Sequence, residues 1–132
     1  LGLPATATGA GVGIAIIDSG IISNTDVEGR IVGFYDFLNG ASTFAMAGDN
    51  YGHGTHVAGL AAGSGAKSSG QYAGVAPGAR LIGMVALDAN GQGRTSDVIN
   101  AINYAIARKD ARPGWLPKRP PTRWGPRSWP AP

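Results

Sequence analysis

Residues 16–20 of this 132-residue chain read Ile-Ile-Asp-Ser-Gly, and they close an apolar run that begins at Gly13. A short, continuous run of this kind is typical of a strand buried on both faces of a parallel sheet. The Ser-Gly pair ends the strand, so Asp18 lies at its carboxyl end, the edge where functional sites of parallel α/β sheets form. A buried carboxylate needs a polar partner. The alternative to a functional role is an acid that caps the junction between strand and turn.

Residues 52–59 read Gly-His-Gly-Thr-His-Val-Ala-Gly and supply a partner for that acid. The glycines on both sides of His53 would allow a substrate backbone and the end of a third strand to approach it closely. An acid and a histidine are two of the three groups that activate a serine for acyl transfer. None of the eight serines stands in a run of small residues typical of a nucleophile. They are Ser19, Ser23, Ser42, Ser64, Ser68, Ser69, Ser96 and Ser128.

The two histidines of this segment could instead be metal ligands. The zinc-protease pattern requires histidines four residues apart with a glutamate between them, whereas His53 and His56 are three apart and enclose Gly54 and Thr55. We therefore predict no metal site, and we expect His56 to be a hydrogen-bonded structural residue. The glycine-rich residues 9–13 precede the strand instead of following it, which argues against a dinucleotide loop, and we predict no cofactor.

A third motif, Gly-Val-Ala-Pro-Gly-Ala at residues 74–79, follows the first two in order. With all three motifs, residues 10–110 resemble the subtilases, the subtilisin-like serine proteases, whose catalytic groups occur in the chain order Asp, His, Ser. The resemblance implies a serine endopeptidase in which Asp18 is the catalytic acid and His53 the catalytic histidine. It implies an α/β fold, a parallel sheet with flanking helices, truncated after residue 110.

The truncation is expected because three later motifs of the family are absent from the sequence. These are the Asn-x-Ser-Leu-Gly substrate strand, the oxyanion-hole asparagine and the Gly-Thr-Ser-x-Ala nucleophile segment. We therefore expect this chain alone to be inactive. The alternatives are a non-catalytic, subtilase-derived binding or regulatory fragment, and a proline-rich adaptor.

The resemblance also implies a substrate-binding loop at Gly91, Gln92 and Gly93, which would pair through its backbone with an extended protein or peptide substrate. The alternative for these residues is a simple turn. Asp49 is expected to serve loop structure first. Calcium sites are common among subtilases, but residues 63–74 lack the carboxylates that calcium prefers, so none is predicted.

Hydrophobic patterns predict three strands, at residues 13–18, 30–37 and 80–87, and two helices, at residues 53–64 and 96–108. This alternation indicates a parallel sheet. Loops are predicted between these elements, at residues 38–52, 65–74 and 88–93, and the second of them is expected to be mobile.

The two predicted helices differ in character. Residues 53–64 include Gly54, Gly59 and Gly63, each of which costs about 1 kcal/mol in a helix interior, so we expect a buried central helix. In the second helix, Ser96 is the predicted N-cap and Asp97 complements the helix dipole. Its apolar face comprises Val98, Ile99, Ile102, Ala105 and Ile106. We expect this face to be only partly buried, because the sheet is incomplete.

Residues 111–132 differ in kind from the rest. Seven of the nine prolines and all three tryptophans lie in residues 112–132. We predict a partial subtilase catalytic domain at residues 1–110 and a Pro/Arg/Trp-rich tail at residues 111–132. The tail is interpreted either as an aberrant, frame-shifted end of the coding sequence or as a natural proline-rich linker. In both cases we expect it to be disordered, because prolines block regular structure.

Composition excludes several classes of protein. The chain has no cysteine, so a disulfide scaffold or thiolate metal site is impossible. Residues 1–111 carry six basic and eight acidic side chains, whereas residues 112–132 carry five basic and no acidic ones. The positive net charge therefore belongs to the tail, and no nucleic-acid partner is predicted. No apolar run approaches the ~20 residues that span a bilayer. No signal peptide is visible, so the expected extracellular location depends on the resemblance.

Overall fold

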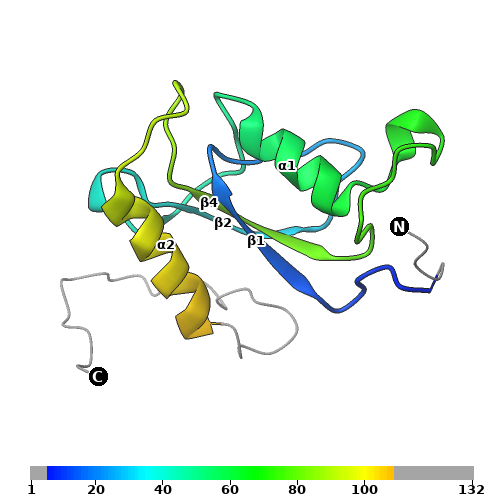
Figure 1. Ribbon diagram of the computed structural model, residues 1–132, viewed down its shortest axis with the longest axis horizontal. Coiled ribbons are helices and arrows are strands. Elements are labelled where there is room, and N and C mark those ends of the chain that lie inside the picture. Colours follow the sequence, from blue (N-terminus) through cyan, green and yellow to red (C-terminus); the bar gives the residue numbers. More distant parts are fainter. Residues whose placement is uncertain (1–5, 109–132) are drawn as a thin grey trace.

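The computed structural model describes residues 6–108, and the predicted tail lies outside this range. The described chain alternates strands and helices, as Figure 1 shows. In chain order the elements are β1 (Gly13–Asp18), β2 (Ile31–Asp36), the 3-10 helix η1 (Leu38–Gly40), β3 (Thr43–Phe44), α1 (His53–Ala62), the 3-10 helix η2 (Ala66–Ser68), β4 (Arg80–Val85) and α2 (Thr95–Arg108).

The strands form one sheet in the order β1-β4-β2-β3. β1, β4 and β2 are parallel, and β3 adds a short antiparallel strand at the edge next to β2. The register pairs Val85 with Asp18 on one side and with Asp36 on the other. Two acids therefore lie at the same level, at the carboxyl edge of the sheet.

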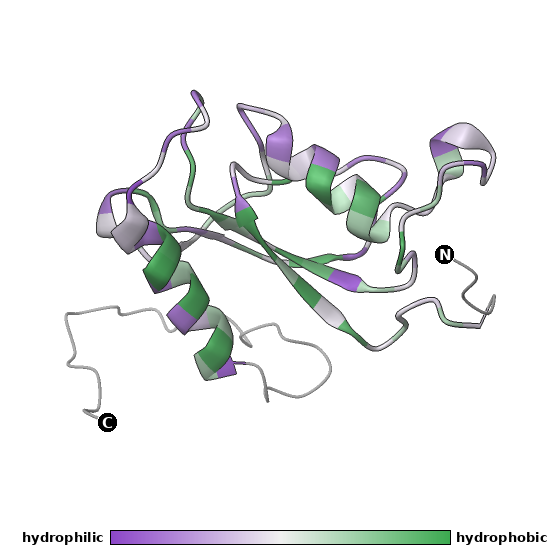
Figure 2. Ribbon diagram, in the orientation of Figure 1, coloured by the Kyte–Doolittle hydropathy of each residue, from purple (hydrophilic) through white to green (hydrophobic). Residues whose placement is uncertain are grey.

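A helix covers each face of the sheet (Figure 1), so the fold has three layers and the predicted α/β class is confirmed. The core residues alternate along β4 because side chains of a strand point to opposite faces. Leu81 belongs to the cluster on the α1 side, whereas Ile82 and Met84 belong to the cluster on the α2 side. Figure 2 shows hydrophobic residues along the strands and also on α1 and α2.

α1 packs through its smallest residues. Ala58 and Ala62 are completely buried against the sheet, while Leu60 on the opposite face is 62% exposed. The prediction of a buried central helix therefore holds for one face only, because within the described residues the opposite face is uncovered. The segment before β4 runs along the end of this helix, where the N–H groups of Val75 and Ala76 donate to the carbonyls of Leu60 and Ala61.

α2 begins one residue before the predicted N-cap, and Ser96 lies inside its first turn. The helix starts after Arg94, whose carbonyl accepts the N–H groups of Asp97 and Val98, so Ser96 is not the N-cap. Asp97 is buried, and its carboxylate accepts the backbone N–H groups of Asn39 and Gly40 at 3.1 Å each. This acid therefore ties α2 to η1, a role that a helix-dipole argument does not reveal.

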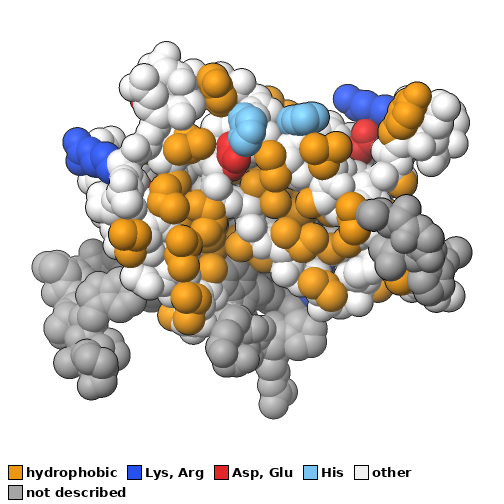
Figure 3. Space-filling model, in the orientation of Figure 1, with side chains coloured by type: hydrophobic (Ala, Val, Ile, Leu, Met, Phe, Trp, Pro, Cys, Tyr) orange, Lys and Arg blue, Asp and Glu red, His pale blue; other side chains and the backbone are white. Residues whose placement is uncertain are grey.

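The apolar face of α2 is divided, as expected from the sequence. Ala101 is buried, and the Tyr104 ring packs against Tyr35, with a centroid distance of 4.8 Å. Ile99, Ile102 and Ile106 remain exposed on the outer side. Figure 3 shows hydrophobic side chains gathered over this part of the surface.

Candidate functional site

Asp18 is the last residue of β1, and its backbone is fixed by the neighbouring strand. Its carbonyl accepts the N–H groups of Ala86 and Leu87, which directly follow β4. Its side chain is buried, and Oδ1 accepts the N–H of Ser19 at 2.7 Å. The carboxylate therefore has little freedom to turn away from the edge of the sheet.

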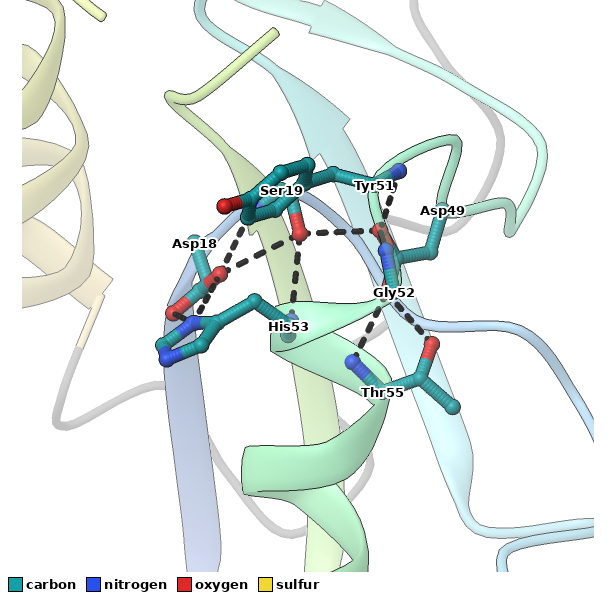
Figure 4. Close-up of polar contacts among 8 residues, drawn as sticks. Asp18, Ser19, Asp49, Tyr51, Gly52, His53 and Thr55 are labelled. Carbon is teal, nitrogen blue, oxygen red and sulfur yellow. Dashed lines mark hydrogen bonds and ion pairs between the residues drawn. The ribbon is translucent and has the colours of Figure 1, made fainter. Parts of the chain in front are cut away.

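His53 is the first residue of α1, and its ring faces that carboxylate (Figure 4). Nδ1 lies 2.8 Å from Oδ1 and 2.8 Å from Oδ2 of Asp18. Because an ionised carboxylate only accepts hydrogen bonds, Nδ1 carries a proton, and in the neutral ring Nε2 then has a free lone pair. The His53 side chain is 55% exposed, so the ring is open to solvent.

The helix start is pressed against the end of β1. A Cβ added to Gly54 would lie 2.2 Å from the carbonyl oxygen of Gly20 and 3.0 Å from the Asp18 Cβ. No side chain other than hydrogen fits there. The glycine after His53 thus permits the short distance between α1 and the acid.

Asp49 organises the turn that leads into α1. Its carboxylate accepts the N–H groups of Tyr51, Gly52 and Thr55, and the Thr55 hydroxyl at 2.6 Å. Burial alone would raise the pKa of Asp49, but hydrogen bonds from Thr55, Gly52 and Ser19 outweigh it and lower the pKa to about 2. Gly52 offers no capping side chain, so Asp49 acts as the cap from three residues earlier.

The expected structural role of Asp49 is therefore found, but the sequence did not predict how many residues its carboxylate contacts. Ser19 and Thr55 belong to the same cluster, and neither was singled out as a site residue. Thr55 also accepts the N–H of Ile22 at 3.0 Å, so the cluster links the helix to the segment after β1. The spacing of an acid four residues before His53 is the sequence signal that points to it.

The loop over residues 88–93 lies beside this region. It starts next to Asp18, and a Cβ on Gly91 would lie 2.7 Å from the Tyr51 ring. The N–H of Gln92 donates to the Asp88 carboxylate, and its carbonyl accepts the Asp88 N–H. Gly93 is exposed, and its backbone N–H and carbonyl make no hydrogen bond within residues 6–108.

His56 differs from its prediction. It is exposed one turn after His53, and within the described chain its ring makes no hydrogen bond. The expected structural hydrogen bond is not formed among residues 6–108, which leave the outer face of α1 uncovered at this position. Figure 3 shows both histidine side chains on the surface, with an acidic side chain beside one of them.

Within residues 6–108, no group of three or more histidine, aspartate or glutamate side chains is arranged to hold a metal ion. No helix in this range is long and apolar enough to cross a membrane. No serine hydroxyl in the same range is hydrogen-bonded to the His53 ring. Ser19, the nearest in sequence to Asp18, is instead engaged with Asp18, Asp49 and the N–H of Gly54.

Comparisons with known proteins place this arrangement in a family. The model of the subtilase family matches residues 9–113. The serine protease AprX of Bacillus subtilis is 45% identical over 108 residues, 82% of this chain and 24% of that protein. Thermitase of Thermoactinomyces vulgaris is 43% identical, over 75% of this chain and 34% of its own length.

The solved structure of Sphericase superposes with a TM-score of 0.73 at 33% identity, covering 83% of this chain and 36% of that one. Relatives at 39% identity include both the minor extracellular protease Epr and the major intracellular serine protease of Bacillus subtilis, so kinship does not decide location. The chain spans about a quarter of the length of AprX and about a third of the length of thermitase. On the extent of the family match, this chain belongs to the subtilase family.

Proposed function

We propose that Asp18 and His53 are the acid and the base of an Asp-His-Ser triad that hydrolyses peptide bonds by acyl transfer. The observation that carries this proposal is the pair of 2.8 Å distances from His53 Nδ1 to both Asp18 oxygens. Asp18 lies at the carboxyl edge of a parallel sheet, where sites of such folds form. Membership of the subtilase family supports the same chemistry.

The geometry fits the division of labour in such a triad. Asp18 holds the imidazole in the tautomer whose Nε2 can accept a proton. Nε2 would take the proton of a serine hydroxyl while the serine oxygen attacks the peptide carbonyl. The buried carboxylate would stabilise the imidazolium that forms, and Nε2 would then give the proton to the leaving amine.

Protein or peptide substrates would bind beside the loop over residues 88–93. Gly93 presents a free N–H and a free carbonyl, the groups that an extended peptide needs for strand addition. A Cβ on Gly93 would lie 2.1 Å from the Ala86 carbonyl oxygen, so glycine is needed to keep this segment in place. Gln92 has its backbone groups engaged within the turn, so its contribution is the smaller one.

This chain by itself is proposed to be inactive. None of its serines has a partner in the His53 ring within the described residues, and a triad without its nucleophile loses several orders of magnitude in turnover. The purified chain is expected to hydrolyse neither casein nor peptide anilides and to resist labelling by a fluorophosphonate probe. Stoichiometric labelling that disappears in His53→Ala would contradict this.

A chimera tests the roles of the two residues directly. Residues 9–108 of this chain would replace the matching segment of AprX, which is 45% identical, and peptide hydrolysis would be measured. His53→Ala and Asp18→Ala should each lower kcat by on the order of 10⁴- to 10⁶-fold, the magnitude known for subtilisin itself.

The matched control is Asp36→Asn, which alters an acid at the same level of β2, on the other side of β4. Its carboxylate accepts the N–H of Leu38, and activity should stay within a few-fold of the parent chimera. An active chimera that tolerates His53→Ala would refute the proposed roles.

An extracellular location and a domain boundary at residue 110 remain predictions.

A further inference from the structure

A single buried hydroxyl joins two carboxylates next to the Asp18–His53 pair. Ser19 Oγ lies 2.8 Å from Asp49 Oδ1 and 3.2 Å from Asp18 Oδ1. It also accepts the N–H of Gly54 at 3.1 Å. A serine hydroxyl has one proton, so it can donate to only one of the two acids. The shorter distance assigns the proton to Asp49.

The direction of this proton matters for Asp18. Its Oδ1 already accepts the N–H of Ser19, and both its oxygens face Nδ1 of His53. A further donor would stabilise the carboxylate charge and make the group a weaker acceptor for the imidazole. When the Ser19 hydroxyl donates to Asp49, Asp18 receives no further donor and remains a strong acceptor for the His53 imidazole.

Asp49 is well placed to keep the hydroxyl turned. Four donors from residues 51–55 fix its carboxylate, with distances between 2.6 and 3.2 Å. Burial raises its pKa, but hydrogen bonds from Thr55, Gly52 and Ser19 lower it to about 2, so Asp49 is ionised at neutral pH and only accepts. Figure 4 shows the cluster running from Thr55 through Asp49 and Ser19 to Asp18.

We propose that Asp49 is a positioning residue: by accepting the Ser19 hydroxyl proton, it keeps that hydroxyl from donating to Asp18 and leaves Asp18 free to hold His53. This inference rests on the proposed function only in that catalysis requires the Asp18–His53 pair. Within residues 6–108, the acids hydrogen-bonded to the Ser19 hydroxyl are Asp18 and Asp49. In the same range, the hydrogen bonds of the His53 ring are to Asp18, so the ring is linked to this hydroxyl through Asp18.

The readout is the proton resonance of His53 Nδ1–H, recorded on the full chain in cold, dilute solution. A stronger acceptor moves this resonance downfield, so it reports how strongly Asp18 binds the ring. In Ser19→Ala we expect no displacement, because the missing hydroxyl was directed elsewhere. In Asp49→Ala the hydroxyl turns to Asp18, and the resonance should move upfield. The double variant Ser19→Ala/Asp49→Ala should return toward the parent position.

Two variants separate hydrogen bonding from charge. Asp49→Asn removes the charge but keeps an acceptor oxygen, so the resonance should stay close to that of the parent. Asp26→Ala removes an equal charge at the other end of α1, where the Asp26 carboxylate accepts the N–H of Lys67, and should have no effect.

A downfield displacement in Ser19→Ala would show that the hydroxyl donates to Asp18 and would overturn the inference. This variant leaves Asp49 in place as the cap of α1, so it carries the test even where Asp49→Ala does not fold. An unchanged resonance in a folded Asp49→Ala variant would also overturn it. If the ¹⁵N shifts of the His53 ring in the parent show no preference for a protonated Nδ1, while its amide spectrum is that of a folded chain, the pair itself is absent and the proposed function fails instead.

Discussion

The ring of His53 lies with Nδ1 equidistant from the two carboxylate oxygens of Asp18, at 2.8 Å from each, across 35 positions of sequence. One residue ends β1 and the other begins α1. The contact therefore joins a strand and a helix that no other ion pair within the described chain connects. A fixed acid that orients a half-exposed imidazole is an arrangement suited to proton transfer.

Replacing Gly54 by alanine should break this junction. Its Cβ would lie 2.2 Å from the Gly20 carbonyl oxygen, and such overpacking costs about 1 to 3 kcal/mol of the free energy of unfolding. The matched control is Gly59→Ala in the same helix, where a Cβ meets nothing within 4 Å. That change should stabilise the chain by about 1 kcal/mol. Denaturant unfolding measures both, and equal effects would contradict the close approach.

Acid should weaken the fold through Asp49. Its pKa falls from 3.8 to about 2 on folding, so the folded state binds the proton less well than the unfolded one. The stabilisation is complete above about pH 5 and is lost as the pH falls toward 2, on the order of 1 to 2 kcal/mol after allowance for solvent screening. Urea unfolding of the parent and of Asp49→Asn at both ends of this range checks it. An identical loss of stability in both proteins would exclude Asp49 as the source.

The uncovered faces should drive association. Ile99, Ile102 and Ile106 are exposed on α2, and β1 is a terminal strand of the described sheet. Exposed apolar patches and sheet edges promote contact between chains. We expect the isolated chain to associate with rising concentration in sedimentation experiments and Ile102→Gln to reduce that association. A parent chain that stays monomeric and unfolds sharply would contradict this prediction.

The proposed substrate-binding loop, residues 88–93, offers a paired comparison in the active chimera. Gly93→Ala forces a Cβ against the Ala86 carbonyl oxygen and the Leu87 side chain, so the free backbone groups of Gly93 are displaced. We expect KM for extended peptides to rise, with little change for a substrate of one residue, because only the long substrate uses strand addition. Gln92→Ala alters an exposed side chain and should leave KM unchanged. An equal rise in both variants would argue against backbone pairing.

Three of the four strands and both α-helices could be predicted from short-range patterns. The predicted bounds of β1 agree with the structure, and those of β2, β4, α1 and α2 differ by at most two residues at either end. These elements have continuous apolar runs or a helical period, which depend on local sequence alone. β3 and η1 were missed within the predicted loop because they depend on pairing with β2 and on the distant carboxylate of Asp97.

In the candidate site, too, the features that motifs reveal were predicted, and those that depend on contacts between distant segments were not. Motif order placed Asp18 and His53 together, and the structure brings them into contact. The cluster around Asp49 was not predicted, because its donors come from a turn whose shape the sequence does not reveal. His56 was assigned a hydrogen bond that the described chain does not contain. Its surroundings depend on what covers the outer face of α1.

The most direct test of the account measures the tautomer of His53 from the ¹⁵N shifts of its ring at about pH 9, where imidazoles are neutral. The parent chain should show a protonated Nδ1 and a lone pair on Nε2. Asp18→Asn should shift the population toward the other tautomer, because an amide can present a donor to Nδ1. His56, exposed on the same helix, is the internal reference and should not change. If His53 shows the same mixture as His56 in both proteins, Asp18 does not orient the ring, and the central claim of a catalytic acid–base pair is wrong.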